Sequence, residues 1–297
     1  SAGTAGALKI TQENRLDTFA SWLVVTTKFI NTGATTMADV YYLANGDPDN
    51  DVLLPGGGYP TDNHVSYQND VIHRCVVGSI PTTAHRDAYV GLCTKDCCAK
   101  AFIYSGWTPA TGAGNNLDLV YAEAPTGGMA PVYFPVGSTT LGQDIAMGLV
   151  YRIGDIPPGD SAIISYAWLF TDSSAVDSAF PEPQLIVNGV PIAPTGPAPM
   201  PTIDSFSACD YPALTSVNVS IANATDKCWS WSKWTWSPSI GLASTTGVNN
   251  TVTFASLAGP TTYTITGTDS ATSMYSCNHR VMYLTVIPCF SASNNGP

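Results

Sequence analysis

The chain of 297 residues is poor in charge, with 11 Lys and Arg against 22 Asp and Glu and a formal net charge of −11. Binding to nucleic-acid phosphates needs clustered basic side chains. The eleven basic residues form no run, so we expect no nucleic-acid partner. No apolar stretch approaches the length needed to cross a bilayer, so we expect no membrane insertion either.

Known catalytic signatures are also missing. The sequence has no GxSxG, HExxH, Walker or dinucleotide-binding motif. Its four histidines are His64, His73, His85 and His279. His85-Arg86-Asp87 places suitable residue types side by side, but a catalytic triad is assembled in space and not by adjacency. We therefore expect a non-catalytic protein that requires no cofactor, with a secreted hydrolase as an alternative.

What the chain does have is short β-branched and aromatic runs, separated by many of its 26 Gly and 22 Pro. This pattern is typical of β-sandwiches and predicts an all-β fold of two tandem sandwich domains. One helical turn is expected at 172–179. The strands expected in the first domain are 21–30, 40–43, 88–92, 101–104, 117–122, 132–134, 145–153 and 162–170.

A Pro-rich segment divides the chain. Five prolines lie between Pro191 and Pro201, and repeated proline removes backbone donors and fixes φ. We therefore predict domains at 1–190 and 203–297, joined by a linker at 191–202. As polyproline II the linker would be a semi-rigid spacer on the order of 30 Å long. The alternatives are a plain tether and a segment packed against either domain.

Eight cysteines divide four and four around this segment. An even number in each domain suits intradomain disulfides and hence an oxidising compartment. A zinc site at Cys93-x3-Cys97-Cys98 is the alternative, disfavoured because there is no CxxC pair and no neighbouring His. The start at Ser1, with no leader, fits a processed secreted protein, so we expect an extracellular or cell-surface location. The cysteines are Cys75, Cys93, Cys97, Cys98, Cys209, Cys228, Cys277 and Cys289.

Two stretches resemble known families. FINTGATTMADVYYLANGDPDND at 29–51 and IGDIPPGDSAIISYAWLF at 153–170 resemble the two ends of large β-sandwich modules in bacterial surface proteins. WSPSIGL at 236–242, YTITGTD at 263–269 and the Cys277 region resemble the immunoglobulin-like, PKD-like modules of surface and secreted proteins of gliding Gram-negative bacteria. The second resemblance implies a seven-strand sandwich without catalysis. It also implies a Cys209–Cys277 disulfide, which leaves Cys228 for Cys289, although four cysteines allow three connectivities.

A tryptophan cluster, WSWSKWTW, interrupts that second pattern. Trp229 and Trp231 share one face of a strand, and Trp234 and Trp236 share the opposite face unless a bulge intervenes. Both faces cannot belong to one core, so one pair is expected in the core. The cluster is expected to form an interface, with core packing and stacking on sugar rings as alternatives.

One acidic turn has the composition of an ion site. Asp47, Asp49 and Asp51 alternate along the chain, with Asn45 just before them. Crowded oxygen ligands suit Ca²⁺, and without a cation the carboxylates repel one another. The spacing is not that of an EF-hand. We expect a solvated acidic turn here, with a calcium site at Asp47, Asp49 and Asp51 as the alternative.

Glycosylation patterns fit a surface location. Three triplets match the N-glycan acceptor pattern, and three Asp-Ser-Ala triplets resemble O-glycan acceptors of the same bacterial group. The predicted acceptors are Asn218, Asn223, Asn249, Ser161, Ser178 and Ser270.

Together these features favour a structural subunit of an extracellular filament or surface assembly, whose partners are copies of itself. The run Ala7-Leu8-Lys9-Ile10-Thr11 is compatible with a strand that adds to another subunit's sheet edge, burying Leu8 and Ile10. The alternative for this run is pairing within its own domain. The alternative function is a secreted adhesin or carbohydrate-binding module that contacts glycans.

Overall fold

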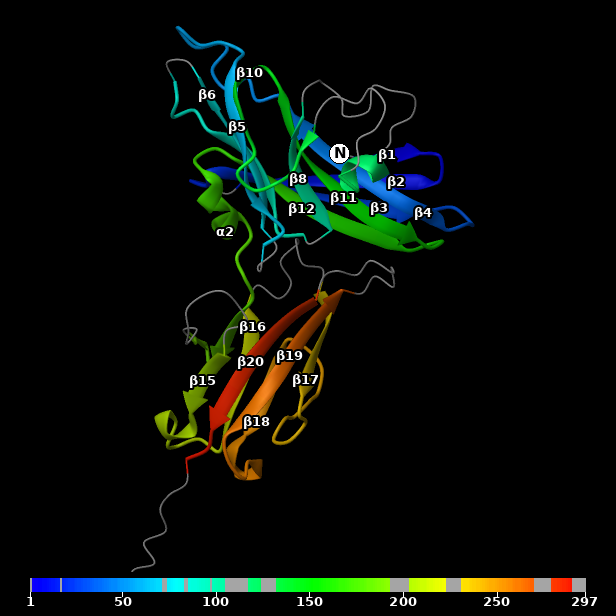
Figure 1. Ribbon diagram of the computed structural model, residues 1–297. Helices are drawn as coiled ribbons and strands as arrows, with labels where there is room; N and C mark the ends of the chain where they lie inside the picture. Colours follow the sequence, from blue (N-terminus) through cyan, green and yellow to red (C-terminus); the bar gives the residue numbers. More distant parts are fainter. Residues whose placement is uncertain are drawn as a thin grey trace, which may run out of the picture. The chain divides into compact units, whose positions relative to one another are not determined.

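The protein forms two compact units, each built from β-sheets (Figure 1). The computed structural model describes residues 2–16, 18–70, 74–82, 85–96, 98–104, 117–123, 132–192, 203–222, 231–269 and 279–289. Within these residues, unit 1 ends at Pro181 and unit 2 begins at Glu182. Almost all the regular structure is strand, which confirms the all-β prediction.

Unit 1 is a sandwich of an eight-stranded and a four-stranded sheet. One hydrophobic core gathers side chains from both sheets, among them Phe29, Val77 and Leu149. In spatial order, the large sheet contains β1 (Ala2–Ala5), β2 (Leu8–Arg15), β3 (Trp22–Asn31), β12 (Ser161–Leu169), β7 (Val90–Thr94), β6 (Cys75–Pro81), β5 (Thr61–Gln68) and β10 (Thr139–Gln143). The small sheet contains β4 (Met37–Gly46), β11 (Ala146–Ile156), β8 (Ala99–Tyr104) and β9 (Val132–Tyr133).

Two short helical segments accompany the sheets of unit 1. The prediction of a strand at 117–122 is wrong, because Leu117–Tyr121 is the helix α1. Its apolar residues Leu117, Val120 and Tyr121 recur at helical spacing and pack on the outer face of the small sheet beside Phe102. The turn expected at 172–179 is confirmed as a 3-10 turn, η1 (Ser173–Ala175), followed by α2 (Val176–Ala179).

Unit 2 is a sandwich of two four-stranded sheets. The first contains β14 (Val190–Pro191), β13 (Gln184–Val187), β16 (Ser216–Ala222) and β18 (Asn249–Thr253). The second contains β15 (Ile203–Ser207), β20 (His279–Ile287), β19 (Thr261–Asp269) and β17 (Trp231–Ser237). Two 3-10 turns, η2 (Ala208–Asp210) and η3 (Phe254–Ser256), complete the unit.

The boundary between the units lies earlier than the sequence suggests. Strand β13 was expected in the first domain, but it pairs with β16 of unit 2, with Leu185 opposite Ile221. Pro191 belongs to β14 and not to a linker. Proline is tolerated there because β14 is an edge strand. Residues 193–202, the rest of the predicted linker, lie outside the described residues.

The tryptophan cluster supplies the core of unit 2. Trp234 and Trp236 are each 2% exposed and pack in its hydrophobic cluster, so the interface assignment for this pair is wrong. Trp234 lies opposite Gly267 on β19, where a Cβ atom would come within 2.8 Å of the indole. The pairing of β17 with β19 changes register between Trp231 and Lys233. This irregularity is the bulge that the sequence pattern allows within the cluster. The side chain of Trp231 and the whole of Trp229 lie outside the described residues.

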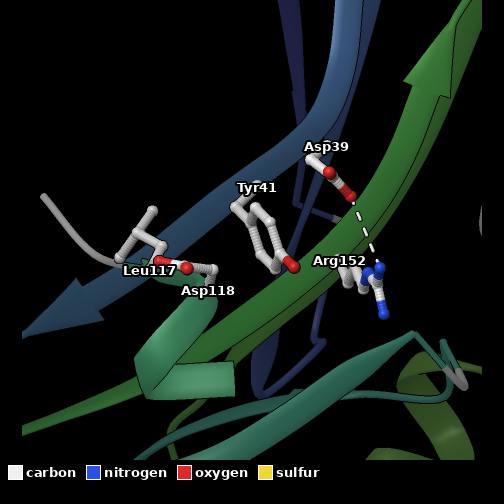
Figure 2. Close-up of a pocket in the computed structure, with 5 residues that line it drawn as sticks. All are labelled: Asp39, Tyr41, Leu117, Asp118 and Arg152. Carbon is white, nitrogen blue, oxygen red and sulfur yellow. Dashed lines mark hydrogen bonds and ion pairs between the residues drawn. The ribbon is translucent and has the colours of Figure 1, made fainter. Parts of the chain in front are cut away.

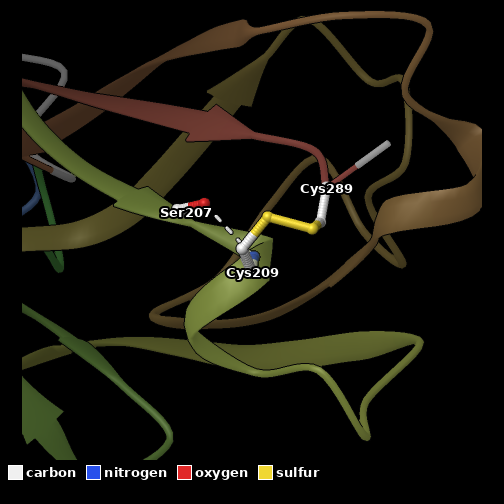
Figure 3. The surroundings of a disulfide bond; sticks show 3 residues. All are labelled: Ser207, Cys209 and Cys289. Carbon is white, nitrogen blue, oxygen red and sulfur yellow. Dashed lines mark hydrogen bonds between the residues drawn. A yellow bond between two sulfur atoms is a disulfide. The ribbon is translucent and has the colours of Figure 1, made fainter. Parts of the chain in front are cut away.

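One disulfide pairing differs from the one that the family resemblance implies. Cys209 bonds Cys289 and not Cys277, with Cα atoms 4.9 Å apart (Figure 3). The cause is topological: β15 runs parallel to β20, with Ser207 opposite Ile287. The two cysteines therefore leave the same end of adjacent strands. Cys228 and Cys277 lie outside the described residues.

The first set of cysteines follows the disulfide prediction at Cys98 but not at Cys75 and Cys93. Cys75 and Cys93 are buried thiols on the neighbouring strands β6 and β7 and are not half-cystines. Burial raises the pKa of Cys75 to about 12, which keeps its thiol protonated and unreactive. Cys98 is disulfide-bonded, and its partner lies outside the described residues, as does Cys97.

Candidate functional sites

The N-terminal hairpin forms one side of the large sheet. Strand β2 pairs with β3 along its whole length, from Leu8 opposite Asn31 to Arg15 opposite Val24. Leu8 and Ile10 pack against the core of unit 1, so they contribute to their own domain and are not free for donation to another subunit. Ahead of them, β1 folds back on β2 through a turn at Gly6, whose φ is +60°. Strand β1 is therefore one edge of this sheet, and β10 is the other.

The four edges of unit 2 are covered or blunted. Strand β17 is bridged on its outer side through Thr235 and Thr246, and β18 through Val252 and Leu242. Strand β14 is two residues long and contains proline. Strand β15 carries Asp204, a carboxylate that is only 5% exposed. Covering segments, proline and inward-pointing charge are all devices that prevent pairing between sheet edges.

The edges of unit 1 differ among themselves. Strand β10 is irregular between Thr140 and Gln143, and β9 has two residues. Strand β4 is bulged near its start, where Asp39 has a φ of +47°. Its second half, from Tyr41 to Gly46, pairs regularly with β11. Strand β1, with the sequence Ala-Gly-Thr-Ala, contains neither proline nor charge, and its pairing with β2 shows no bulge.

An acidic cluster lies where β4 ends, but its membership differs from the prediction. Ligand atoms of Asp47, Asp49 and Asp144 lie within 4.8 Å of one another. Asp144 comes from the loop between β10 and β11. Burial, then the charges of Asp49 and Asp144, raise the pKa of Asp47 to about 6. The pKa of Asp49 is raised by burial and by Asp144.

Asp51 has another role, so its assignment as an ion ligand is corrected. It is 1% exposed, and its Oδ1 accepts a hydrogen bond from the backbone of Gly58 at 3.2 Å. Asp51 therefore closes the loop that follows the acidic turn. The calcium site stays an untested alternative, now with Asp144 in place of Asp51.

A pocket of about 460 Å³ opens on the outer face of the small sheet (Figure 2). Its described lining consists of Asp39, Tyr41, Leu117, Asp118 and Arg152. Tyr41 on β4 stands directly opposite Arg152 on β11, so both side chains project from one face. The guanidinium of Arg152 lies 3.4 Å from a carboxylate oxygen of Asp39. The pocket thus combines one aromatic ring with charged groups of both signs.

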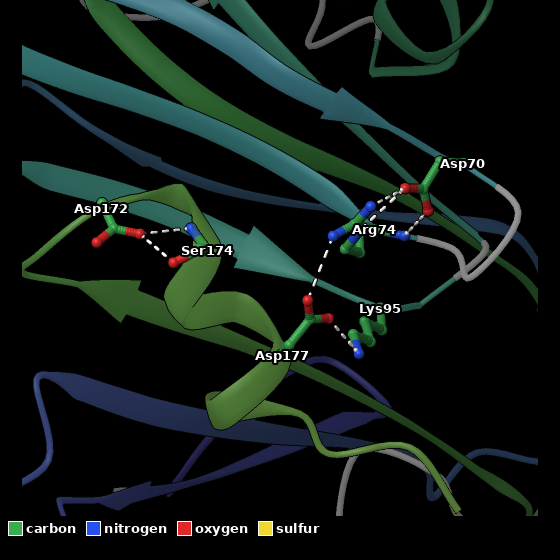
Figure 4. A network of polar contacts seen from close by, with 6 residues as sticks. All are labelled: Asp70, Arg74, Lys95, Asp172, Ser174 and Asp177. Carbon is green, nitrogen blue, oxygen red and sulfur yellow. Dashed lines mark hydrogen bonds and ion pairs between the residues drawn. The ribbon is translucent and has the colours of Figure 1, made fainter. Parts of the chain in front are cut away.

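A network of ion pairs connects α2 to the ends of strands in the large sheet (Figure 4). Lys95 is 1% exposed at its side chain and pairs with Asp177 at 2.7 Å. Arg74 contacts Asp177 at 3.3 Å and Asp70 at 2.8 Å. A buried ammonium requires such a partner, so this network is structural.

The predicted glycan acceptors differ in accessibility. Ser178, Asn218 and Asn249 are exposed, while Ser161 is half-buried. Asn223 and Ser270 lie outside the described residues. The side chain of Asn218 accepts a hydrogen bond from Thr251, the third residue of the neighbouring acceptor triplet. Modification of these residues stays a prediction.

The histidines with described side chains make local contacts. Burial lowers the pKa of His64, whose ring centroid lies 6.4 Å from that of Tyr89. Nε2 of His85 lies 3.0 Å from the carbonyl oxygen of Pro55. Neither contact pairs a histidine with a carboxylate, the arrangement that the hydrolase alternative requires. His73 and the side chain of His279 lie outside the described residues.

Comparisons with known proteins identify no family. No protein-family model matches the chain, and no curated protein does. Among solved structures, one titled as a polysaccharide lyase matches with 12% identity and a TM-score of 0.30, over 97% of this chain and 35% of that protein. This chain thus spans about a third of the length of that polysaccharide lyase. Among the described residues, the helices are all too short or too polar to cross a membrane.

Proposed function

We propose that this protein is a non-catalytic structural subunit of an extracellular filament or surface assembly. One observation carries the proposal: among the described residues, β1 is a sheet edge that lacks the proline, charge, bulge or covering segment found at most of the other edges. An open edge presents unpaired N–H and C=O groups, and these are a template for adding a strand of another chain.

The geometry of the hairpin determines which backbone N–H and C=O groups of β1 can hydrogen-bond to a strand of another subunit. Ala5 and Leu8 flank a two-residue turn, so by the usual alternation they form a hydrogen-bonded pair. Gly3, opposite Ile10, is then also bonded to β2. The backbone N–H and C=O of Thr4 consequently point away from β2, toward the position of a new strand.

A filament needs two different surfaces, because pairing β1 with β1 would close a dimer. The regular half of β4, Tyr41–Gly46, is a second edge in unit 1. We propose that β1 of one copy pairs with β4 of the next. At roughly 1 kcal/mol per net hydrogen bond, four residues give a weak contact, which repetition along a filament strengthens.

The proposed location outside the cell rests on chemistry and resemblance. The Cys209–Cys289 disulfide suits an oxidising compartment, and the two sequence resemblances are to surface and secreted modules. The same resemblances support the absence of catalysis. A secreted adhesin or carbohydrate-binding module remains the second candidate, favoured by the Tyr41 pocket.

A single substitution tests the edge. Thr4→Pro removes the outward N–H and leaves the bonds within the hairpin, since proline is tolerated on the free side of an edge strand. Thr4→Val changes the side chain and keeps the N–H, and so serves as the matched control. Sedimentation velocity over rising protein concentration should show association of the wild type and the valine variant but not of the proline variant. Association of all three to the same extent would refute a contact through β1.

A further inference from the structure

The pocket around Tyr41 is built from three separate elements that hold it in shape. Asp39 and Tyr41 lie on β4, Arg152 on β11, and Leu117 and Asp118 at the start of α1. Its volume of about 460 Å³ falls within the range of small-molecule sites, roughly 300–1,000 Å³. A hydrogen bond from the backbone N–H of Asp39 to Asp155 Oδ1, at 2.9 Å, fixes the left-handed turn at its rim.

The aromatic wall of the pocket is held from behind. The ring of Tyr41 makes an edge-to-face contact with Tyr121, with centroids 6.1 Å apart. Tyr121 is in turn 5.0 Å from the ammonium of Lys100, which pairs with Glu123 at 2.6 Å. A supported ring of this kind offers a flat apolar surface at little cost in side-chain entropy.

The polar wall supplies both hydrogen-bond acceptors and donors. The carboxylates of Asp39 and Asp118 accept hydrogen bonds, and the guanidinium of Arg152 donates them. Arg152 is 31% exposed and Asp39 64% exposed at their side chains, so both are accessible to a ligand. Figure 2 shows Tyr41 between Asp118 on one side and the Asp39–Arg152 pair on the other.

The charge of the lining selects the ligand class. Two carboxylates and one guanidinium give the described lining a net charge of −1, in a protein whose formal net charge is −11. An anionic ligand is repelled by this arrangement. A neutral polyol with one apolar face satisfies the ring, the acceptors and the donors together. We propose that this pocket binds a neutral sugar residue, stacked on Tyr41 and hydrogen-bonded to Asp39, Asp118 and Arg152.

Saturation-transfer NMR with four neutral hexaoses tests the proposal: cellohexaose, maltohexaose, mannohexaose and xylohexaose. At least one should bind the wild type, and oligogalacturonate should bind more weakly than that sugar. Tyr41→Ala should weaken binding about tenfold or more, the factor that roughly 1.4 kcal/mol of lost contact gives. Tyr59→Ala is the matched control, because Tyr59 is 57% exposed in a loop outside the pocket lining.

Asp118→Asn keeps the proposal testable should Tyr41→Ala fail to fold. Asp118 is an exposed residue of α1. Its replacement is therefore expected to leave the fold intact and to weaken sugar binding several-fold. Three results would overturn the proposal: no binding to any of the four hexaoses, binding that neither variant changes, or preference for oligogalacturonate. Thr4 lies outside the described pocket lining, so sugar binding by the non-associating Thr4→Pro variant tests the pocket separately from the assembly.

Discussion

Asp204 makes the stability of unit 2 depend on pH in a direction that can be worked out from the structure. The residue is 5% exposed, and its Oδ1 has no hydrogen-bond partner within the described part of the chain. It lies on β15, two residues before the buried Phe206. Burial raises the pKa of Asp204 from 3.8 to about 6. The charged form is therefore less favourable in the folded unit than in the unfolded chain.

A raised carboxyl pKa means that stability is highest below the unfolded pKa and is lost as pH rises through the folded pKa. At about 1.4 kcal/mol per pKa unit, the change from 3.8 to about 6 corresponds to at most about 3 kcal/mol. Asp204→Asn removes the charge. The variant should be more stable than the wild type at pH 7.5, and the gain should shrink toward zero near pH 4.

Peptide-resolved hydrogen exchange separates the two units in the intact chain. Amides of β20, which pairs with β15, should be protected in the variant by up to about two orders of magnitude more than in the wild type at pH 7.5. Peptides from β12 in unit 1 serve as the internal control and should not change. An Asn variant that gains no protection at pH 7.5, or the same gain at every pH, would refute the assigned cause.

Two further predictions concern packing and charge. Gly267→Ala should destabilise unit 2 by about 1–3 kcal/mol, because the new Cβ meets the Trp234 indole. Gly259→Ala, where nothing lies within 4 Å, should change the denaturant midpoint little, and equal losses for both would contradict the packing account. Asp144→Asn should lower the pKa of Asp47 from about 6 toward its ordinary value, since Asp144 is one of the charges that raise it. An NMR titration that finds no change would remove Asp144 from the cluster.

Strands with apolar buried faces could be predicted from the sequence. The strand expected at 21–30 corresponds to β3, and the one expected at 145–153 corresponds to β11, each within a few residues. Strand β5 was missed for a physical reason: its inward positions include Thr61 and Asn63, which are 1% and 0% exposed. Asn63 donates to the carbonyl of Ile145, at 3.2 Å. When a core position is filled by a hydrogen-bonded amide side chain, the strand lacks the alternation of apolar and polar residues by which it could be predicted.

The sites depend on register and connectivity, which local pattern does not encode. Asp47 and Asp49 could be found from their spacing, but Asp144 is brought in by a loop nearly a hundred residues later. The pairing of Tyr41 with Arg152 follows from the register of β4 on β11. The Cys209–Cys289 bond follows from the parallel pairing of β15 with β20. No spacing within the chain points to any of these contacts.

Negative-stain electron microscopy of the purified wild type beside Thr4→Pro tests the central claim most directly. Strand addition at β1 predicts regular filaments of the wild type and of Thr4→Val, and dispersed single particles of the proline variant. Filaments in all three samples would contradict the assigned edge. Monomers or closed dimers of the wild type at every concentration would contradict the filament itself.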